Sequence, residues 1–151
     1  MQTIHALLQE LGKLINIPGL ALDDDQTCTL DIDGQPIALR WLEESDTLLA
    51  YGVLMRDAPE SVPLLRFLLK ANLFGAASKG LHIGLHAPSN AFVMSGTVAV
   101  SSLDAESLGT YLGFMADSVA LWKAKISELG RQAAPGGAPE EGVADPALLR
   151  C

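Results

Sequence analysis

The segment Ser61–Phe74 constrains this chain more than any other stretch, because it is predicted to form a helix that is apolar around most of its circumference. Its leading serine can cap the helix, and Pro63 is tolerated in the first turn, where a missing N–H removes no hydrogen bond. Only Arg66, Lys70 and Asn72 interrupt the apolar side chains, whereas a helix on a solvated surface keeps a polar face. We therefore expect one side to pack on the chain's own core and the other on the same helix of a second copy. The residues expected at this dimer interface are Leu64, Phe67, Leu68 and Leu73.

The composition indicates a single domain that exposes apolar surface. The chain has 151 residues, of which 49% are hydrophobic, and its mean hydropathy is +0.28 although its formal net charge is −8. This combination is typical of a protein whose apolar surface is kept soluble by charge repulsion. The few Lys and Arg residues are scattered, which argues against a nucleic acid or an anionic membrane as partner. No apolar run is long enough to span a bilayer, so membrane insertion is not expected.

The two cysteines and the N-terminal residues predict a cytoplasmic protein. Cys28 lies in a predicted strand and Cys151 at the end of the sequence, which is neither a disulfide framework nor a metal-binding spacing. The N-terminal residues lack the basic and apolar regions of a signal peptide. A reducing compartment fits both observations.

Hydrophobic periodicity predicts a helix followed by a β-hairpin in the first part of the chain. Residues 2–16 repeat apolar side chains every three or four positions, as an amphipathic helix does. Residues Thr27–Ile32 and Gln35–Leu42 alternate in polarity on either side of Asp33-Gly34, which is a strong hairpin turn.

Two further strands are predicted around the apolar helix. Residues Thr47–Met55 are apolar on both faces, so this strand is expected at the centre of the sheet. The segment that begins at Leu81 alternates, and we expect Leu81, Ile83 and Leu85 to point inward.

A last strand at residues 92–100 precedes the most regular helix of the sequence. Ser102 or Asp104 can cap the start of this helix, and Gly130 stands where a helix is expected to stop. The predicted fold is therefore α+β, a twisted, mainly antiparallel five-stranded sheet with three helices in the order α-βββ-α-ββ-α. Residues 1–129 form the predicted domain, and residues 130–151 are expected to be a disordered tail rich in Ala, Pro and Gly.

Each pattern that resembles an active site has a simpler structural explanation. The run from Asp31 to Gly34 begins like a calcium loop but lacks the remaining ligands. His82 and His86 are four residues apart on a strand, or about 13 Å, which is too far to share one ion. Residues 75–80 follow a helix, whereas a phosphate-binding loop follows a strand. We therefore predict no catalytic residue, no metal, no cofactor and no enzymatic activity.

Three stretches give the chain a resemblance to class I type III secretion chaperones of the Tir-chaperone-like family, over residues 2–129. Their residue types, acidity and element order are similar to those of that family. The stretches are Leu48–Leu54, then Leu64–Gly75 continuing into Leu81–Leu85, and finally Leu103–Leu108 continuing to Phe114 and the turn Val119–Trp122.

This resemblance implies a bacterial cytoplasmic homodimer. Such a chaperone binds a non-globular segment near the N-terminus of a secreted effector and keeps the effector soluble and competent for secretion. It uses no nucleotide itself. The secretion ATPase is a further partner that the resemblance suggests.

Two recognition modes follow from this prediction. An extended client strand can add to an open sheet edge, and apolar client side chains can fill grooves beside the first helix. Each apolar residue proposed for such a groove has the core as its alternative place. The residues predicted to line the client grooves are Leu7, Leu11, Leu14, Leu30, Ile32, Ile37, Leu39 and Trp41.

Two other functions remain open at this stage. A dimeric α+β binding module with a regulatory role would have a similar architecture. A small-ligand-binding protein would instead have an enclosed pocket with convergent polar groups. The sequence carries no such polar constellation, which favours the chaperone.

Overall fold

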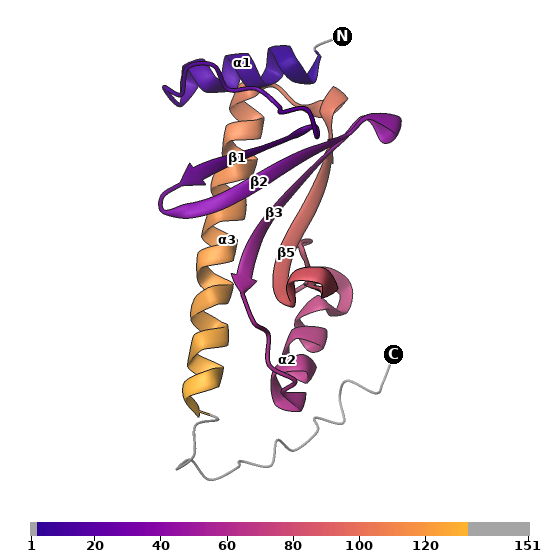
Figure 1. Cartoon of the computed structure of the whole chain (residues 1–151), viewed down its shortest axis with the longest axis vertical. Coiled ribbons are helices and arrows are strands. Elements are labelled where there is room, and N and C mark those ends of the chain that lie inside the picture. Colours follow the sequence, from indigo (N-terminus) through magenta and orange to yellow (C-terminus); the bar gives the residue numbers. More distant parts are fainter. Residues whose placement is uncertain (1–2, 133–151) are drawn as a thin grey trace.

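The computed structural model describes residues 3–132, which form an open antiparallel sheet with helices packed against it (Figure 1). Figure 1 shows α3 running along the length of the sheet, with α1 across one end and α2 near the other. The elements are α1 (Ile4–Leu14), β1 (Thr27–Ile32), β2 (Gln35–Leu42), β3 (Thr47–Met55), α2 (Val62–Asn72), β4 (His82–His86), β5 (Ala91–Ala99) and α3 (Ala105–Gln132).

The described elements confirm the predicted fold class and element order. The strands pair antiparallel in the order β1-β2-β3-β5-β4, so β3 is central as predicted and β1 and β4 are the two edges. The hairpin turn at Asp33-Gly34 has positive φ at both residues, the geometry that matches the right-handed twist of the flanking strands. The predicted tail begins within α3, and residues 133–151 lie outside the described part of the chain.

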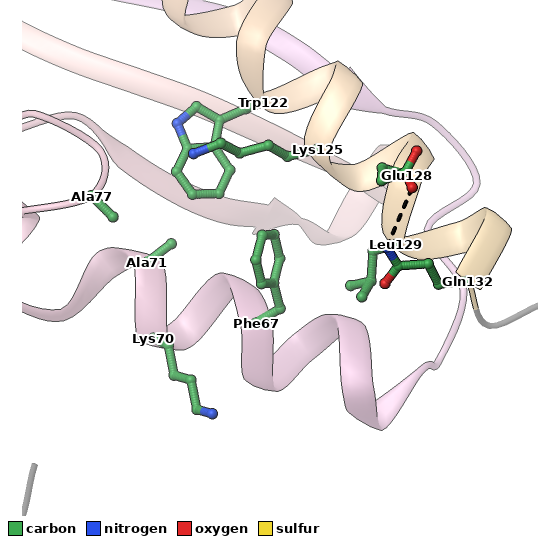
Figure 2. Close-up of a pocket in the computed structure, with 9 residues that line it drawn as sticks. All are labelled: Phe67, Lys70, Ala71, Ala77, Trp122, Lys125, Glu128, Leu129 and Gln132. Carbon is green, nitrogen blue, oxygen red and sulfur yellow. Dashed lines mark hydrogen bonds between the residues drawn. The ribbon is translucent and has the colours of Figure 1, made fainter. Parts of the chain in front are cut away.

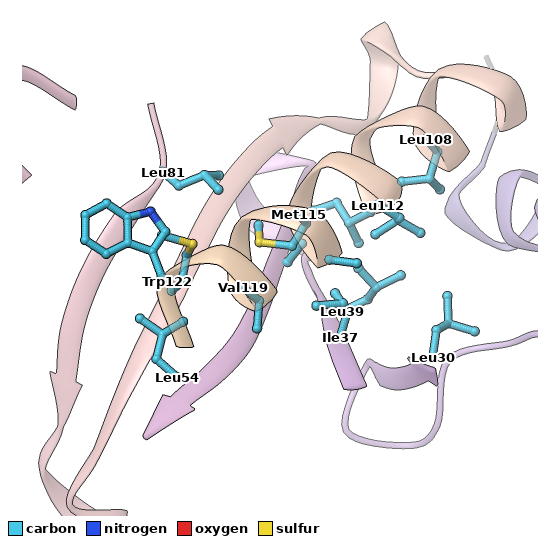
Figure 3. Packing of buried hydrophobic residues seen from close by; sticks show 14 of the residues in the cluster. Leu30, Ile37, Leu39, Leu54, Leu81, Leu108, Leu112, Met115, Val119 and Trp122 are labelled. Carbon is cyan, nitrogen blue, oxygen red and sulfur yellow. The ribbon is translucent and has the colours of Figure 1, made fainter. Parts of the chain in front are cut away.

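The core lies between α3 and one face of the sheet (Figure 3). Figure 3 labels Met115 and Val119 of α3 together with Ile37 and Leu39 of β2 in this core, and the side chains of Val119 and Ile37 both reach the position of Gly52. Gly52 of β3 completes this contact, because a Cβ built on it would lie 2.7 Å from Cγ2 of Val119. The close approach of α3 to the middle of the sheet therefore depends on a position without a side chain.

Two predictions about local structure are wrong. Gly130 does not end the last helix, which continues to Gln132, because Gly130 does not adopt the positive φ of a glycine helix stop. Leu85 is exposed instead of inward, because the buried core cluster extends along β4 only as far as Ile83. Of the two proposed caps of α3, Asp104 performs the role: its Oδ1 accepts a hydrogen bond from the backbone N–H of Ser107 at 2.8 Å.

Matched glycine substitutions test the packing of α3. We expect Gly52→Ala to lower the free energy of unfolding by about 1–3 kcal/mol, since the added methyl group overlaps a stiff, fully buried valine. Gly113→Ala, in α3 with open space around it, should raise that free energy by about 0.5–1 kcal/mol through helix propensity. Urea unfolding measures both changes. Equal effects of the two substitutions would contradict the packing described.

Candidate functional site

The apolar circumference of α2 divides into a buried face and an exposed stripe. Ser61 caps the helix, its hydroxyl accepting from the Leu64 N–H at 3.4 Å. Leu64, Leu68 and Ala71 enter the core. The exposed side chains recur every three or four residues and continue past the helix end, and we call them the α2 stripe: Val62, Leu65, Leu69, Leu73 and Phe74.

Phe74 is the most unusual member of the α2 stripe. Its side chain is 86% exposed, and its backbone has a φ of 58° and a ψ of 9°. Bulky residues rarely adopt this left-handed conformation, and such strained positions concentrate at functional sites. The sequence offers no signal for this conformation, because it depends on the bend between α2 and the following Gly75.

The predicted dimer-interface residues are separated by this division of α2. Leu64 and Leu68 are 6% and 4% exposed, so their side chains are packed within the chain, and their contribution to a dimer interface stays a prediction. Phe67 is half-buried against Trp122, with the ring centroids 5.8 Å apart. Leu73 alone among the four lies in the α2 stripe.

A groove of about 550 Å³ separates α2 from the end of α3 (Figure 2). Phe67 projects from α2 into the groove, and Trp122 forms part of the opposite wall. The ammonium of Lys125 lies 4.5 Å from the centre of the Trp122 ring, a cation–π contact that covers part of the indole. The groove therefore has an apolar floor and a charged rim but no convergent set of polar groups.

The second large apolar surface is the face of the sheet opposite α3. We call it the outer sheet face; its half-buried hydrophobic residues are Leu49, Tyr51, Val53 and Val93. None of these four belongs to the core or packs against it. A hollow of about 500 Å³ lies over them, bordered by Arg40 and His86. The sequence pattern indicates that β3 is apolar on both faces, but it does not show that one of these faces is left uncovered by the helices of residues 3–132.

The structure divides the predicted client-binding residues into core and accessible positions. Five of them fill the core: Leu7, Leu11, Leu30, Ile37 and Leu39. The core is the alternative place expected for each of them, and their role in client binding stays a prediction.

The other three predicted client-binding residues can be reached from solvent. Leu14 is exposed at the end of α1, whereas Ile32 and Trp41 are half-buried against the core. The Trp41 indole N–H donates to a carboxylate oxygen of Asp46 at 3.3 Å, and its ring meets that of His5 edge-on at 6.3 Å. These contacts hold Trp41, near the end of β2, between His5 of α1 and Asp46 of the connection to β3.

The outer edge of β1 presents backbone hydrogen-bonding groups. Trp41 N–H donates to Gln26 C=O, so Gln26 pairs inward and, by antiparallel alternation, Thr27, Thr29 and Asp31 direct their backbone groups outward. Asp23 already pairs with both backbone groups of Thr27: its Oδ1 accepts from the Thr27 N–H at 2.8 Å, and its own N–H donates to the Thr27 C=O. Among the described residues, the open part of this edge is therefore Thr29 to Asp31.

Asp23 adds negative charge beside this edge. Hydrogen bonds from the backbone and then the side chain of Thr27 hold the pKa of its carboxyl below the usual range. The carboxylate is therefore ionised wherever the protein is handled near neutral pH. Together with Asp31 it makes the open edge acidic.

Within residues 3–132, no group of three or more His, Cys, Asp or Glu side chains is arranged to hold a metal ion. No helix in that range is both long and apolar enough to cross a membrane. Burial, and secondarily the charge of Asp23, raises the pKa of the Cys28 thiol to about 11. Such a pKa keeps the Cys28 side chain in the less reactive thiol form near neutral pH.

Thiol labelling tests the environment of Cys28. In a Cys151→Ser variant, Cys28 is the only thiol that can react. We expect it to react with a disulfide reagent at pH 8 roughly 100-fold more slowly in the folded than in the urea-unfolded protein. The reason is that a pKa of about 11 leaves far less thiolate than the usual thiol pKa does. Comparable rates in both states would show that the thiol is exposed and ordinary.

Comparison with known proteins places this architecture. The sequence profile of the Tir chaperone protein (CesT) family matches residues 6–123. Among curated proteins, no sequence matches the chain. The chain is similar in fold to the ExsC–ExsE complex, with a TM-score of 0.71 and 21% identity over 82% of this chain and 92% of that one.

Two further solved structures share the fold. The HopA1–SchA chaperone–effector complex matches with a TM-score of 0.67 and 20% identity, over 78% of this chain and 91% of that one. The Yersinia pestis type III secretion chaperone SycH, solved with a stable fragment of YscM2, matches with a TM-score of 0.63 and 16% identity, over 80% of this chain and 99% of that one.

Proposed function

The chain belongs to the Tir chaperone protein (CesT) family, and from this premise we propose that it is a bacterial cytoplasmic type III secretion chaperone. As a homodimer it binds a non-globular segment near the N-terminus of a secreted effector and keeps that effector soluble and secretion-competent. The secretion ATPase is a predicted second partner. The observation that carries the proposal is the outer sheet face, an apolar surface that no part of the core covers.

The outer sheet face suits a partner that arrives unfolded. Its hydrophobic residues lie in an open hollow and not in an enclosed pocket, so extended client segments can lay apolar side chains across it. Burial of apolar surface contributes about 25 cal/mol per Å² before the cost of ordering the client. An unfolded client pays that ordering cost on binding, which leaves a complex that can be taken apart for export.

The β1 edge adds a second mode of binding beside this face. The open N–H and C=O groups at Thr29 and Asp31 can pair with a client strand in any sequence, because only backbone groups are recognised. The negative charge of Asp23 and Asp31 favours clients that carry basic residues between their apolar anchors. Backbone pairing supplies general affinity, and the pockets and charges supply selection.

The α2 stripe is the proposed homodimer contact. Three apolar side chains on one face of α2 and two that follow its end, the last being the strained and exposed Phe74, form a surface that two copies can cover reciprocally. The dimer would then leave the outer sheet face and the β1 edge of each copy available for the client. Of the interface residues expected from sequence, Leu73 is the one that this surface retains.

Affinity capture tests the client. The tagged protein, purified from cells that make the secretion system, should retain a secreted protein in stoichiometric amount, protected from protease over a stretch near but not at its N-terminus. Tyr51→Glu places a charge on the outer sheet face and should reduce recovery at least about tenfold. Leu121→Glu, at an exposed position of α3, is the matched control and should retain the client.

Two outcomes would contradict the proposal, each in a different part. Recovery of no secreted protein from cells proven to make the secretion system would overturn the chaperone function. Recovery that is equally strong with Tyr51→Glu would overturn the assignment of the client to the outer sheet face. Recovery of a cytoplasmic regulator instead would favour the regulatory binding module.

Sedimentation tests the homodimer. We expect a dimer at micromolar concentration, and we expect Leu69→Glu and Phe74→Ser each to raise its dissociation constant at least about tenfold, since both remove apolar burial from the α2 stripe. Both side chains are exposed in the single chain, so thermal unfolding of the monomer should change little. Leu121→Glu should leave the dimer unchanged. A monomeric parent protein would contradict this interface, and so would a dissociation constant that neither substitution raises.

A further inference from the structure

The second edge of the sheet, at β4, is occupied by a side chain of α2. The backbone N–H of Ile83 donates to Oδ1 of Asn72 at 2.8 Å. The Nδ2 group of Asn72 donates in return to the backbone C=O of Ile83 at 2.6 Å. A primary amide thus makes both hydrogen bonds that a residue of an added strand would make to this position.

Alternation along β4 shows how much of the edge remains open. Since the backbone groups of Ile83 point outward, those of Leu81 and Leu85 point outward as well. The Leu81 N–H donates to the Ser78 C=O at 3.1 Å, which uses part of that position. Among the described residues, Leu85 is therefore the outward position of β4 whose backbone N–H and C=O stay open, and it lies next to the strand's end.

The two edges of the sheet are consequently unequal. At β1 two successive outward positions, Thr29 and Asp31, are open, and an incoming strand can make a continuous ladder with them. At β4 the central outward position, Ile83, is already paired. An incoming strand would have to displace an amide that is half-buried and held on a helix.

We propose that Asn72 is a specificity-determining residue that closes the β4 edge against strand addition and thereby directs an incoming strand to β1. The identity of that strand as a client segment rests on the proposed function. The closure of the β4 edge does not, because an exposed edge also invites pairing between copies of the same chain. Asn72 would serve both purposes, selecting one edge for the client and preventing assembly edge to edge.

The chemistry of asparagine fits this role. The side chain carries one acceptor and two donors on a short planar group, so one residue can satisfy both an N–H and a C=O. Aspartate would lack the donor and place a negative charge against the Ile83 C=O. Alanine or serine would leave the N–H and C=O of Ile83 without their amide partner, and the β4 edge would then be open to another strand.

The mass of the protein as a function of concentration tests this closure without any client. We expect Asn72→Ala to form species of at least twice the mass of the parent assembly in sedimentation velocity at tens of micromolar, where the parent protein does not. Hydrogen exchange of the Ile83 amide should accelerate at least about tenfold. Asn72→Ser, which also loses the amide, should behave in the same way and serves if Asn72→Ala does not fold.

Two controls separate edge closure from general destabilisation. Asn90→Ala removes another tertiary amide hydrogen bond, from Asn90 Nδ2 to the Ala58 C=O at 3.1 Å, which involves no backbone group of β4. It should lower stability without raising the mass. Adding Leu85→Pro to Asn72→Ala should restore the parent mass, because proline removes one of the two outward N–H groups then open, at Ile83 and Leu85, so an added strand can no longer form a continuous ladder.

The proposal is overturned if folded Asn72→Ala and Asn72→Ser keep the parent mass. It is equally overturned if Asn90→Ala associates to the same extent, or if Leu85→Pro does not reverse the association. Each of these results leaves the client-capture experiment unaffected. Failure to capture a client would in turn leave the test of Asn72 intact.

Discussion

The packing of one long helix against one face of a five-stranded antiparallel sheet determines which surfaces of this protein are available. Contact between α3 and the sheet centre requires the absence of a side chain at Gly52 and buries Val119 completely. The same helix cannot cover the other face, so the hydrophobic residues there remain at the surface. An apolar outer face is thus a consequence of the architecture, and a net charge of −8 offsets its tendency to aggregate.

Backbone N–H and C=O groups at the edges of the sheet are the second feature on which the proposed function depends. An open sheet has two edges, and each is a template for another strand unless something occupies it. In this chain the edges are treated differently, with Asn72 on the β4 edge and only a partial cap by Asp23 on the β1 edge. The proposed function needs this asymmetry, because a chaperone has to accept a client strand without polymerising through its own sheet.

Membership of the Tir chaperone protein (CesT) family and the local physics support the same interpretation by independent routes. The family places the chain among chaperones but does not assign surfaces. The distribution of exposed apolar side chains assigns them: the α2 stripe suits a rigid, self-complementary contact, and the open hollow over β3 and β5 suits an adaptable one. Under the proposed function, separate surfaces for the client and for the second copy would let the client be exchanged while the dimer persists.

The sequence by itself determined the elements and their order, because those depend on local patterns. Alternation around Asp33-Gly34 specified the first hairpin, and three- and four-residue spacing specified the helices. It could not decide which of these apolar residues are core. A strand pattern separates two faces without saying which one a helix covers, so Leu39 became core while Leu49 stayed at the surface. An apolar circumference does not tell which side of α2 faces the core, and only packing in the complete fold decided that Leu68 is buried and Leu69 exposed. The pairing of Asn72 with Ile83 depended on tertiary structure for the same reason, since a side chain and a strand edge from different elements meet only once the fold is complete.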